Sequence, residues 1–259
     1  MSEILFTKEN GVAKITLNRP DAFNSVNDGM GKQWLAALDT CKEDAEIRAV
    51  IITGTGKAFC AGQDLKEVTD PSLNPGFKVL LEERYSPIVK KITELEKPVI
   101  AAVNGVAAGA GANLALSCDI ILASSKASFI QAFSAIGLVP DSAGTYNLPR
   151  LVGRARAMAF CMLGDKISAE EAERIGMIYK MFDAEDLEEE TNKIATRMAG
   201  MATHGLALTK RAINASMKNT FDEQLELETA LQIEAANTAD YREGVAAFVE
   251  KRIPVFTGK

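Results

Sequence analysis

Three short and almost wholly apolar segments constrain the fold of this chain more than any other feature. They cover residues 49–54, 98–105 and 120–123, and they alternate with stretches in which apolar residues recur at helical spacing. A strand that is apolar on both faces needs cover on both, which parallel strands between helices provide. We therefore expect an α/β core built on parallel strands and not a sandwich of antiparallel sheets.

The rest of the chain fits one core domain with a helical C-terminal section. Residues 4–6 and 12–17 flank Asn10-Gly11, a dipeptide suited to a turn with positive φ, and they predict a β-hairpin. Helical spacing follows at residues 28–43 and 76–95. Later helices are predicted at residues 153–163, 168–175, 184–200, 205–217, 221–236 and 239–250. No Pro/Ser-rich linker separates the two halves, which favours one continuous core domain. We assign residues 1–200 to this domain and residues 201–259 to its helical C-terminal region.

Composition excludes several classes of function. Lys and Arg number 29 against 35 Asp and Glu, so the net charge is −6 and no basic surface for nucleic acid is expected. The chain has one histidine, His204, which argues against a histidine-based catalytic triad or a multi-histidine metal site. We predict a structural role for His204 and no metal.

Cysteine spacing and hydropathy indicate the compartment. Four cysteines lie far apart without a C-x-x-C pair, and we expect them to be reduced: Cys41, Cys60, Cys118 and Cys161. The first ten residues have neither an apolar signal core nor an Arg-rich leader, and no later run is apolar over the ~18 residues of a membrane span. The expectation is a cytoplasmic protein without a membrane partner.

Three segments follow predicted strands, where open α/β folds usually bind ligands: residues 58–65, 104–113 and 133–145. Glycine or alanine fills positions 107–112, which exposes backbone N–H groups at a helix start and suits a negative oxygen. Tight helix packing is the alternative, and a phosphate loop is disfavoured because the Walker lysine is missing. Asp141 in the third segment is either a catalytic acid or a helix N-cap.

At this point the chain closely resembles the crotonase, or enoyl-CoA hydratase/isomerase, superfamily over essentially its whole length. No single motif is decisive, but their order and spacing are. The matching segments are residues 17–20, 59–65, 97–111, 119–120, 137–141, 148–153 and 168–172. Within the family the chain is most similar to the ring 1,2-epoxyphenylacetyl-CoA isomerases of bacterial phenylacetate degradation, through residues 60–65, 104–112, 153–158, 240–248 and 256–259.

The resemblance implies a role for each matching residue. The backbone N–H groups of Gln63 and Ala110 would hold the thioester oxygen, and Asp141 would move the proton. Asn113 and Phe133 stand where the hydratases carry two glutamates, and neither can act as a general base. Residues near coenzyme A and the acyl group would be Ala22, Phe23, Ala61, Asp64, Leu65, Asn113 and Phe133.

The resemblance also implies a crotonase-type superhelix of ββα turns with a C-terminal trimerisation region, assembled as a homotrimer or a dimer of trimers. The expected activity is an acyl-CoA isomerisation, of either 1,2-epoxyphenylacetyl-CoA or a 3-enoyl-CoA. No cofactor is implied, because coenzyme A is part of the substrate. A weak enoyl-CoA hydratase and a non-catalytic acyl-CoA-binding scaffold are the alternatives. The 4-chlorobenzoyl-CoA dehalogenases also use an aspartate at the position of Asp141, but they rely on a Trp at the position of Phe133 and on a His earlier in the chain, and this sequence supplies neither.

Overall fold

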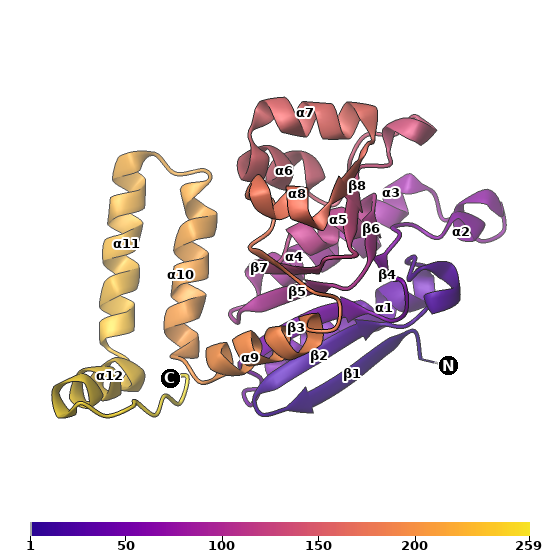
Figure 1. Cartoon of the computed structure of the whole chain (residues 1–259). Coiled ribbons are helices and arrows are strands. Elements are labelled where there is room, and N and C mark those ends of the chain that lie inside the picture. Colours follow the sequence, from indigo (N-terminus) through magenta and orange to yellow (C-terminus); the bar gives the residue numbers. More distant parts are fainter. Residues whose placement is uncertain (1) are drawn as a thin grey trace.

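The computed structural model describes residues 2–259 and contains two β-sheets (Figure 1). The larger sheet has six strands in the order β1-β2-β3-β5-β7-β10, and the smaller has four in the order β4-β6-β8-β9. The strands of the larger sheet are β1 (Ile4–Glu9), β2 (Val12–Leu17), β3 (Ala49–Gly54), β5 (Val99–Val103), β7 (Ile120–Ser124) and β10 (Lys180–Phe182). Those of the smaller sheet are β4 (Ala58–Cys60), β6 (Val106–Ala108), β8 (Ser128–Ile130) and β9 (Lys166–Ser168).

The pairing confirms the predicted hairpin and the parallel core. β1 and β2 run antiparallel around Asn10 and Gly11, whose φ angles are 50° and 76°. The pairs β2–β3, β3–β5, β5–β7 and β7–β10 are all parallel. Successive pairs β3–β4, β5–β6 and β7–β8 each place one strand in each sheet before a helical segment follows. This repeating ββα order is the α/β superhelix expected for the fold class.

The parallel strands are buried on both faces, as their apolar sequences predict. In β3, Val50 and Ile52 belong to the main core, whereas Ile51 faces the opposite side. There it packs in a smaller cluster with Leu187 and Ala195 of α9 (Leu187–Ala199), which covers that face of the sheet in Figure 1. Burying each large side chain contributes roughly 1.5–3 kcal/mol, so both layers of cover stabilise the sheet.

The helices follow the predicted order with some differences. The longer helices are α1 (Asp28–Glu43), α4 (Ser86–Glu94), α6 (Gly144–Val152), α7 (Arg154–Leu163), α9 (Leu187–Ala199), α10 (Thr203–Ser216), α11 (Phe221–Ala236) and α12 (Ala239–Glu250). The shorter ones are α2 (Leu65–Thr69), α3 (Phe77–Val79), α5 (Ala110–Leu116) and α8 (Ala169–Arg174). The helix expected over residues 76–95 is divided, because η2 (Leu80–Tyr85) is π-helical between α3 and α4.

The structure contains more short strands than the sequence predicts. The strands β4, β6, β9 and β10 have three residues each, too few for hydrophobic alternation to reveal them. The expectation of an almost wholly helical second half is therefore wrong at β9 and β10. Two helices begin at sequences that fit a capping box. Ser168 Oγ accepts from Glu171 N at the start of α8, and Thr220 and Glu223 form the full reciprocal box of α11.

The three C-terminal helices lie to one side of the sheets in Figure 1, with α11 beside α10 and α12 across their lower end. These helices and the segment after them carry several of the most exposed large apolar side chains: Phe221 on α11 at 77%, Phe248 and Val249 on α12 at 85% and 73%, and Ile253 after α12 at 86%. Monomeric proteins rarely expose large contiguous apolar patches. Within residues 2–259, no helix has the length and hydropathy needed to cross a membrane.

Candidate active site

Two backbone segments leave the smaller sheet side by side, because β4 and β6 are neighbours that run parallel. They are residues 61–65 and the turn at Gly109, which has φ 54° and precedes α5. A Cβ atom at Gly62 would lie 3.3 Å from the backbone nitrogen of Ala110, and Gly62 has φ 90°. Glycine at this position therefore lets the backbone at Gln63 approach that of Ala110.

The backbone N–H groups of Gln63 and Ala110 have no hydrogen-bond acceptor within residues 2–259. Gln63 forms an isolated bridge with Val26, in which the flanking residues Gly62 and Asp64 make the hydrogen bonds. Ala110 is the first residue of α5, where a helix leaves its N–H groups without an internal acceptor. Two such amides can stabilise a negative oxygen.

Asp141 lies half-buried in the loop between η3 (Ser134–Ile136) and α6. Burial raises the pKa of its carboxyl group above the usual range, and the Ser142 hydroxyl, which donates to Oδ1 at 2.8 Å, opposes this shift. The cap residue of α6 is Ala143, and no side chain caps that helix. The alternative of Asp141 as a helix N-cap is therefore wrong.

The loop that carries Asp141 has an unusual backbone. Ser142 and Ala143 both have positive φ angles, of 50° and 61°. Such a conformation costs roughly 1–3 kcal/mol in a residue with a side chain and persists only where the surroundings enforce it. The surroundings must therefore supply specific support for Asp141.

Asn113 supplies that support. Its side chain is fully buried, its Nδ2 donates to the backbone oxygen of Asp141 at 2.9 Å, and its Oδ1 accepts from Gln131 Nε2 at 2.8 Å. A Cβ atom at Gly144 would lie 2.2 Å from Asn113 Nδ2, so only glycine admits this contact. Asn113 thus contacts the loop behind Asp141.

The aromatic ring of Phe133 lies over the turn that begins α5. Its Cζ would be 3.8 Å from a Cβ atom on Gly109, and Phe133 is buried. The ring therefore forms part of an apolar wall one residue from Ala110.

The residues predicted near coenzyme A divide into two groups. Ala22 and Phe23 end η1 (Pro20–Ala22), and Phe23, which is 53% exposed, accepts a hydrogen bond from Ala61 N at 3.0 Å. Leu65 is 64% exposed at the start of α2. The hydrogen bond between Ala61 and Phe23 joins the end of η1 to the segment that leads to Gln63.

Asp64 is different, because its carboxylate is already engaged. It caps α2 by accepting from Lys66 N at 2.9 Å, and its Oδ2 lies 2.7 Å from Arg19 Nη2. Asp64 is also buried. Its side chain thus holds the segment after β4 in place.

Sequence reasoning missed three residues next to this site. Glu67, Arg84 and Tyr85 are all buried and form hydrogen bonds with the side chain of Gln63. Glu67 lies one helical turn after Gln63, but no pattern in the sequence links it with residues 84 and 85. Only the fold brings them together.

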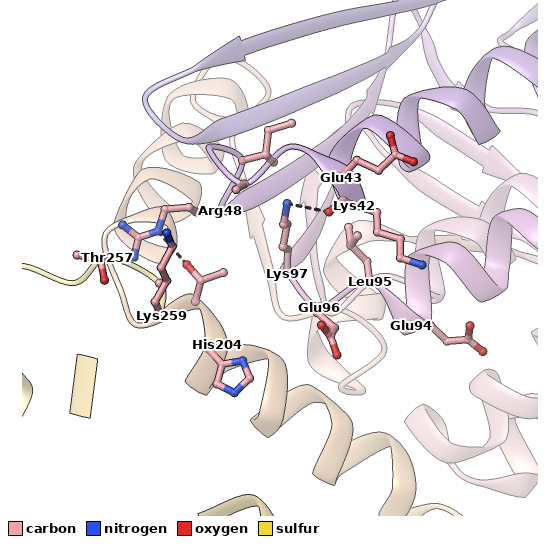
Figure 2. A pocket seen from close by; sticks show the side chains of 14 residues that line it. Lys42, Glu43, Arg48, Glu94, Leu95, Glu96, Lys97, His204, Thr257 and Lys259 are labelled. Carbon is pink, nitrogen blue, oxygen red and sulfur yellow. Dashed lines mark hydrogen bonds between the residues drawn. The ribbon is translucent and has the colours of Figure 1, made fainter. Parts of the chain in front are cut away.

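A hollow of about 660 Å³ lies elsewhere, between the C-terminal end of α1, the start of β5 and the chain terminus (Figure 2). There Lys97 Nζ donates to the backbone oxygen of Lys42, as Figure 2 shows. It also donates to the backbone oxygens of Cys41, near the end of α1, and of Asp44, just after it. His204 borders the hollow, and its Nε2 lies 3.1 Å from Glu234 Oε1. The only histidine is therefore remote from Asp141 and in a structural contact.

The predicted reduced state of the cysteines is consistent with the structure, where Cys41, Cys60 and Cys118 are buried and Cys161 is half-buried, all as free thiols. Over residues 2–259, no three His, Cys, Asp or Glu side chains gather as a metal site would require.

Comparison with known proteins extends over the whole chain. Residues 7–259 match the family model described as enoyl-CoA hydratase/isomerase. The chain is 49% identical to the 1,2-epoxyphenylacetyl-CoA isomerase of Escherichia coli, with 100% of both chains covered. It is 45% identical to a probable enoyl-CoA hydratase of Rhodobacter capsulatus, over 96% of this chain and 95% of that one.

Solved structures give the same result. A putative enoyl-CoA hydratase of Streptomyces coelicolor superimposes with a TM-score of 0.93 at 34% identity, covering 99% of this chain and 94% of the other. An enoyl-CoA hydratase subunit of Geobacillus kaustophilus gives a TM-score of 0.91 at 34% identity, covering 99% and 98%. The backbone that carries the two free amides and Asp141 is thus shared with these proteins.

Proposed function

Because the chain belongs to the enoyl-CoA hydratase/isomerase family, we propose that it acts as an isomerase on an acyl-CoA thioester, with Asp141 as the acid and base. The single observation that carries this proposal is the identity of the side chains around the two free amides. The positions that match the hydratase glutamates hold Asn113, which is fully buried, and Phe133, which is apolar. Asp141 remains as the half-buried carboxylic acid with a raised pKa.

The proposed mechanism begins with the thioester oxygen between the N–H groups of Gln63 and Ala110. With a 3-enoyl-CoA, the Asp141 carboxylate takes a proton from C2, and the electron pair moves onto the thioester oxygen as an enolate. The same proton returns to C4 as the double bond forms between C2 and C3. Each backbone donor contributes roughly 3–4 kcal/mol to such an intermediate.

One carboxyl group suffices for this reaction, because the proton that it removes is the one that it returns. The raised pKa of Asp141 supports this role, since it makes the carboxylate a stronger base toward the proton on C2. No redox cofactor or metal enters these steps, and coenzyme A comes with the substrate. The rearrangement of 1,2-epoxyphenylacetyl-CoA to its oxepin is the second candidate reaction, and it is supported by the activity named for the E. coli relative.

We further propose that residues 1–200 form the catalytic domain and 201–259 the contacts of a homotrimer or a dimer of trimers. The exposed apolar side chains of α11 and α12, among them Phe221 and Phe248, support a surface that a second copy covers. Light scattering of the purified protein distinguishes these assemblies from a monomer.

The test of function is turnover of a 3-enoyl-CoA, 1,2-epoxyphenylacetyl-CoA and a 2-enoyl-CoA by the protein and by Asp141→Asn. We expect isomerisation to exceed hydration, and the amide to lower kcat at least about 100-fold because it cannot accept a proton. Asp186→Asn, at an exposed position before α9, is the matched control and should keep full activity. Full turnover by Asp141→Asn contradicts the proposed mechanism. Faster hydration than isomerisation supports the hydratase alternative, and acyl-CoA binding without any turnover supports the scaffold.

A further inference from the structure

The side chain of Gln63 is held by its neighbours far more firmly than a substrate-facing glutamine needs. Its Nε2 donates to Glu67 Oε2 at 2.6 Å and to Asp64 O at 3.2 Å. Its Oε1 accepts from the Tyr85 hydroxyl at 2.9 Å and from Arg84 Nη1 at 3.4 Å. All four interactions belong to the residue whose backbone N–H is one of the two free donors.

The group around Gln63 is itself anchored in the protein core. Arg84 Nη1 and Nη2 lie 2.6 and 3.1 Å from the two oxygens of Glu67, and both side chains are buried. Glu67 Oε1 also accepts from the backbone N–H of Asp28 at 3.0 Å, at the start of α1. The stem of Arg84 packs on Gly31, where a Cβ atom would lie 2.8 Å from Arg84 Cγ. Removing one member of such a buried pair leaves the other charge uncompensated.

Tyr85 completes the group from the other side. It is 2% exposed, and burial raises the pKa of its phenol well above the ordinary value, with the charges of Cys60 and Asp141 adding to the shift. The hydroxyl therefore stays protonated and remains a donor to Gln63. Arg84 and Tyr85 both belong to the π-helical segment η2, a local widening of a helix that is frequent at functional sites.

The orientation of the Gln63 N–H depends on a flexible position. The peptide that contains this N–H begins at Gly62, which has no Cβ and a φ of 90°. Glycine restricts the adjacent peptide less than any other residue does. Hydrogen bonds weaken steeply as the donor angle bends, and an oxyanion hole works because its donors are oriented before the charge develops.

We propose that Tyr85, Arg84 and Glu67 are positioning residues that act through the Gln63 side chain and orient its backbone N–H toward the substrate's thioester oxygen. This inference rests on the proposed function, since it gives the Gln63 N–H the role of oxyanion donor. It extends the site from two amides to a group of side chains on α2 and η2. The stability of the enolate is then set partly by residues that never touch the substrate.

Tyr85→Phe is the sharpest test, because it removes one oxygen and keeps the ring. Losing one oxyanion donor entirely costs about 100–1,000-fold in kcat, so misaligning it should cost about tenfold, with KM nearly unchanged. Tyr179→Phe, at a position 68% exposed, is the matched control. Gln63→Ala keeps the backbone N–H but removes all four side-chain interactions, so it should lose at least as much as Tyr85→Phe. The double variant should lose no more than Gln63→Ala alone, because the Tyr85 hydroxyl then has no Gln63 side chain to act through.

Binding of acetoacetyl-CoA gives a second readout that needs no turnover. Its enolate places a negative oxygen in the same hole, so its enolate absorbance should decrease in Tyr85→Phe while coenzyme A still binds. A kcat and an enolate signal equal to those of the parent protein overturn the inference, as do additive losses in the double variant. If the parent protein turns over no enoyl or epoxide substrate, the proposed function fails, and the enolate signal alone then decides the role of Tyr85.

Discussion

Replacing Asn113 by leucine tests how the Asp141 loop is held. Leucine has a similar size and branching but cannot donate to the Asp141 backbone oxygen or accept from Gln131 Nε2, the two hydrogen bonds of 2.9 and 2.8 Å that Asn113 makes. Gln131 Nε2 is left without a partner, which costs about 1–3 kcal/mol. The Asp141 oxygen keeps the N–H of Gly144 at 2.8 Å, so the loss of its second hydrogen bond costs only about 0.5–1.5 kcal/mol. The middle of the summed range is about 3 kcal/mol, and added apolar burial offsets up to ~2 kcal/mol of it. We therefore expect the free energy of unfolding to fall by about 1–3 kcal/mol.

The same change should lower activity although Asp141 remains. A catalytic group displaced by about 1 Å loses roughly 100-fold in rate, so kcat should decrease by about 10–100-fold. Urea unfolding and a 3-enoyl-CoA assay measure the two effects. Asn192→Leu, at an exposed position on α9, is the control and should stay within about 0.5 kcal/mol of the parent protein.

A second substitution separates stability from catalysis. Adding Gln131→Leu to Asn113→Leu removes the amide left without a partner and should recover about 1–3 kcal/mol of stability. It supplies no donor to Asp141 and should leave kcat low. Parental stability and activity in Asn113→Leu, or a further loss of stability in the double variant, refute the idea that this pair of amides supports the loop.

Three other changes probe the same structure. The pKa of Asp141 is raised in the folded protein, so the unfolded chain loses this proton at a lower pH than the folded one does. Ionisation of Asp141 therefore destabilises the folded state as pH rises above the ordinary aspartate pKa, which is about 3.9. Asp141→Asn should therefore raise Tm at pH 7 and lose this advantage below about pH 4, as calorimetry at both pH values would reveal. Gly144→Ala should lower both Tm and kcat, because the new methyl group would lie 2.2 Å from Asn113 Nδ2. Gly205→Ala in α10 is the control, and it should leave Tm unchanged or slightly higher, because its nearest contact would be at 3.8 Å. Thr220→Ala removes the capping box of α11 and should lower stability by ~1 kcal/mol in a denaturant titration, while Thr220→Ser should not.

The long apolar strands could be predicted because burial on both faces leaves a mark in the sequence. β3 and β5 each contribute alternate residues to the two cores, so nearly every position is apolar. The β1–β2 hairpin could also be predicted from the sequence, since only a few dipeptides suit its turn. The three-residue strands β4 and β6 left no such mark, although they position both free amides.

The candidate site was predictable in its main-chain part and much less so in its supporting side chains. The Gly/Ala run at residues 107–112 exposes backbone, and this property needs no distant partner to be recognised. In contrast, the contact between Tyr85 and Gln63 spans 22 residues. It depends on where the fold places η2 relative to residues 61–65, which the sequence does not reveal. The π-helical segment η2 divides the helix predicted over residues 76–95 and carries Tyr85, but only the structure reveals this division.

Asn113 links the two halves of the site through one short helix. It lies three residues after Ala110 in α5, so the two occupy the same face, one turn apart. The first residue offers a backbone donor to the substrate, and the second holds the main chain behind Asp141. Any shift of α5 therefore moves the donor and the base together, which preserves their separation. A carboxylate at position 113 could not make this contact, because it has no N–H to donate to the Asp141 backbone oxygen. The amide at position 113 and the acid at position 141 thus form a single arrangement: in the proposed mechanism Asp141 moves the proton, and Asn113 holds the main chain of Asp141 in place.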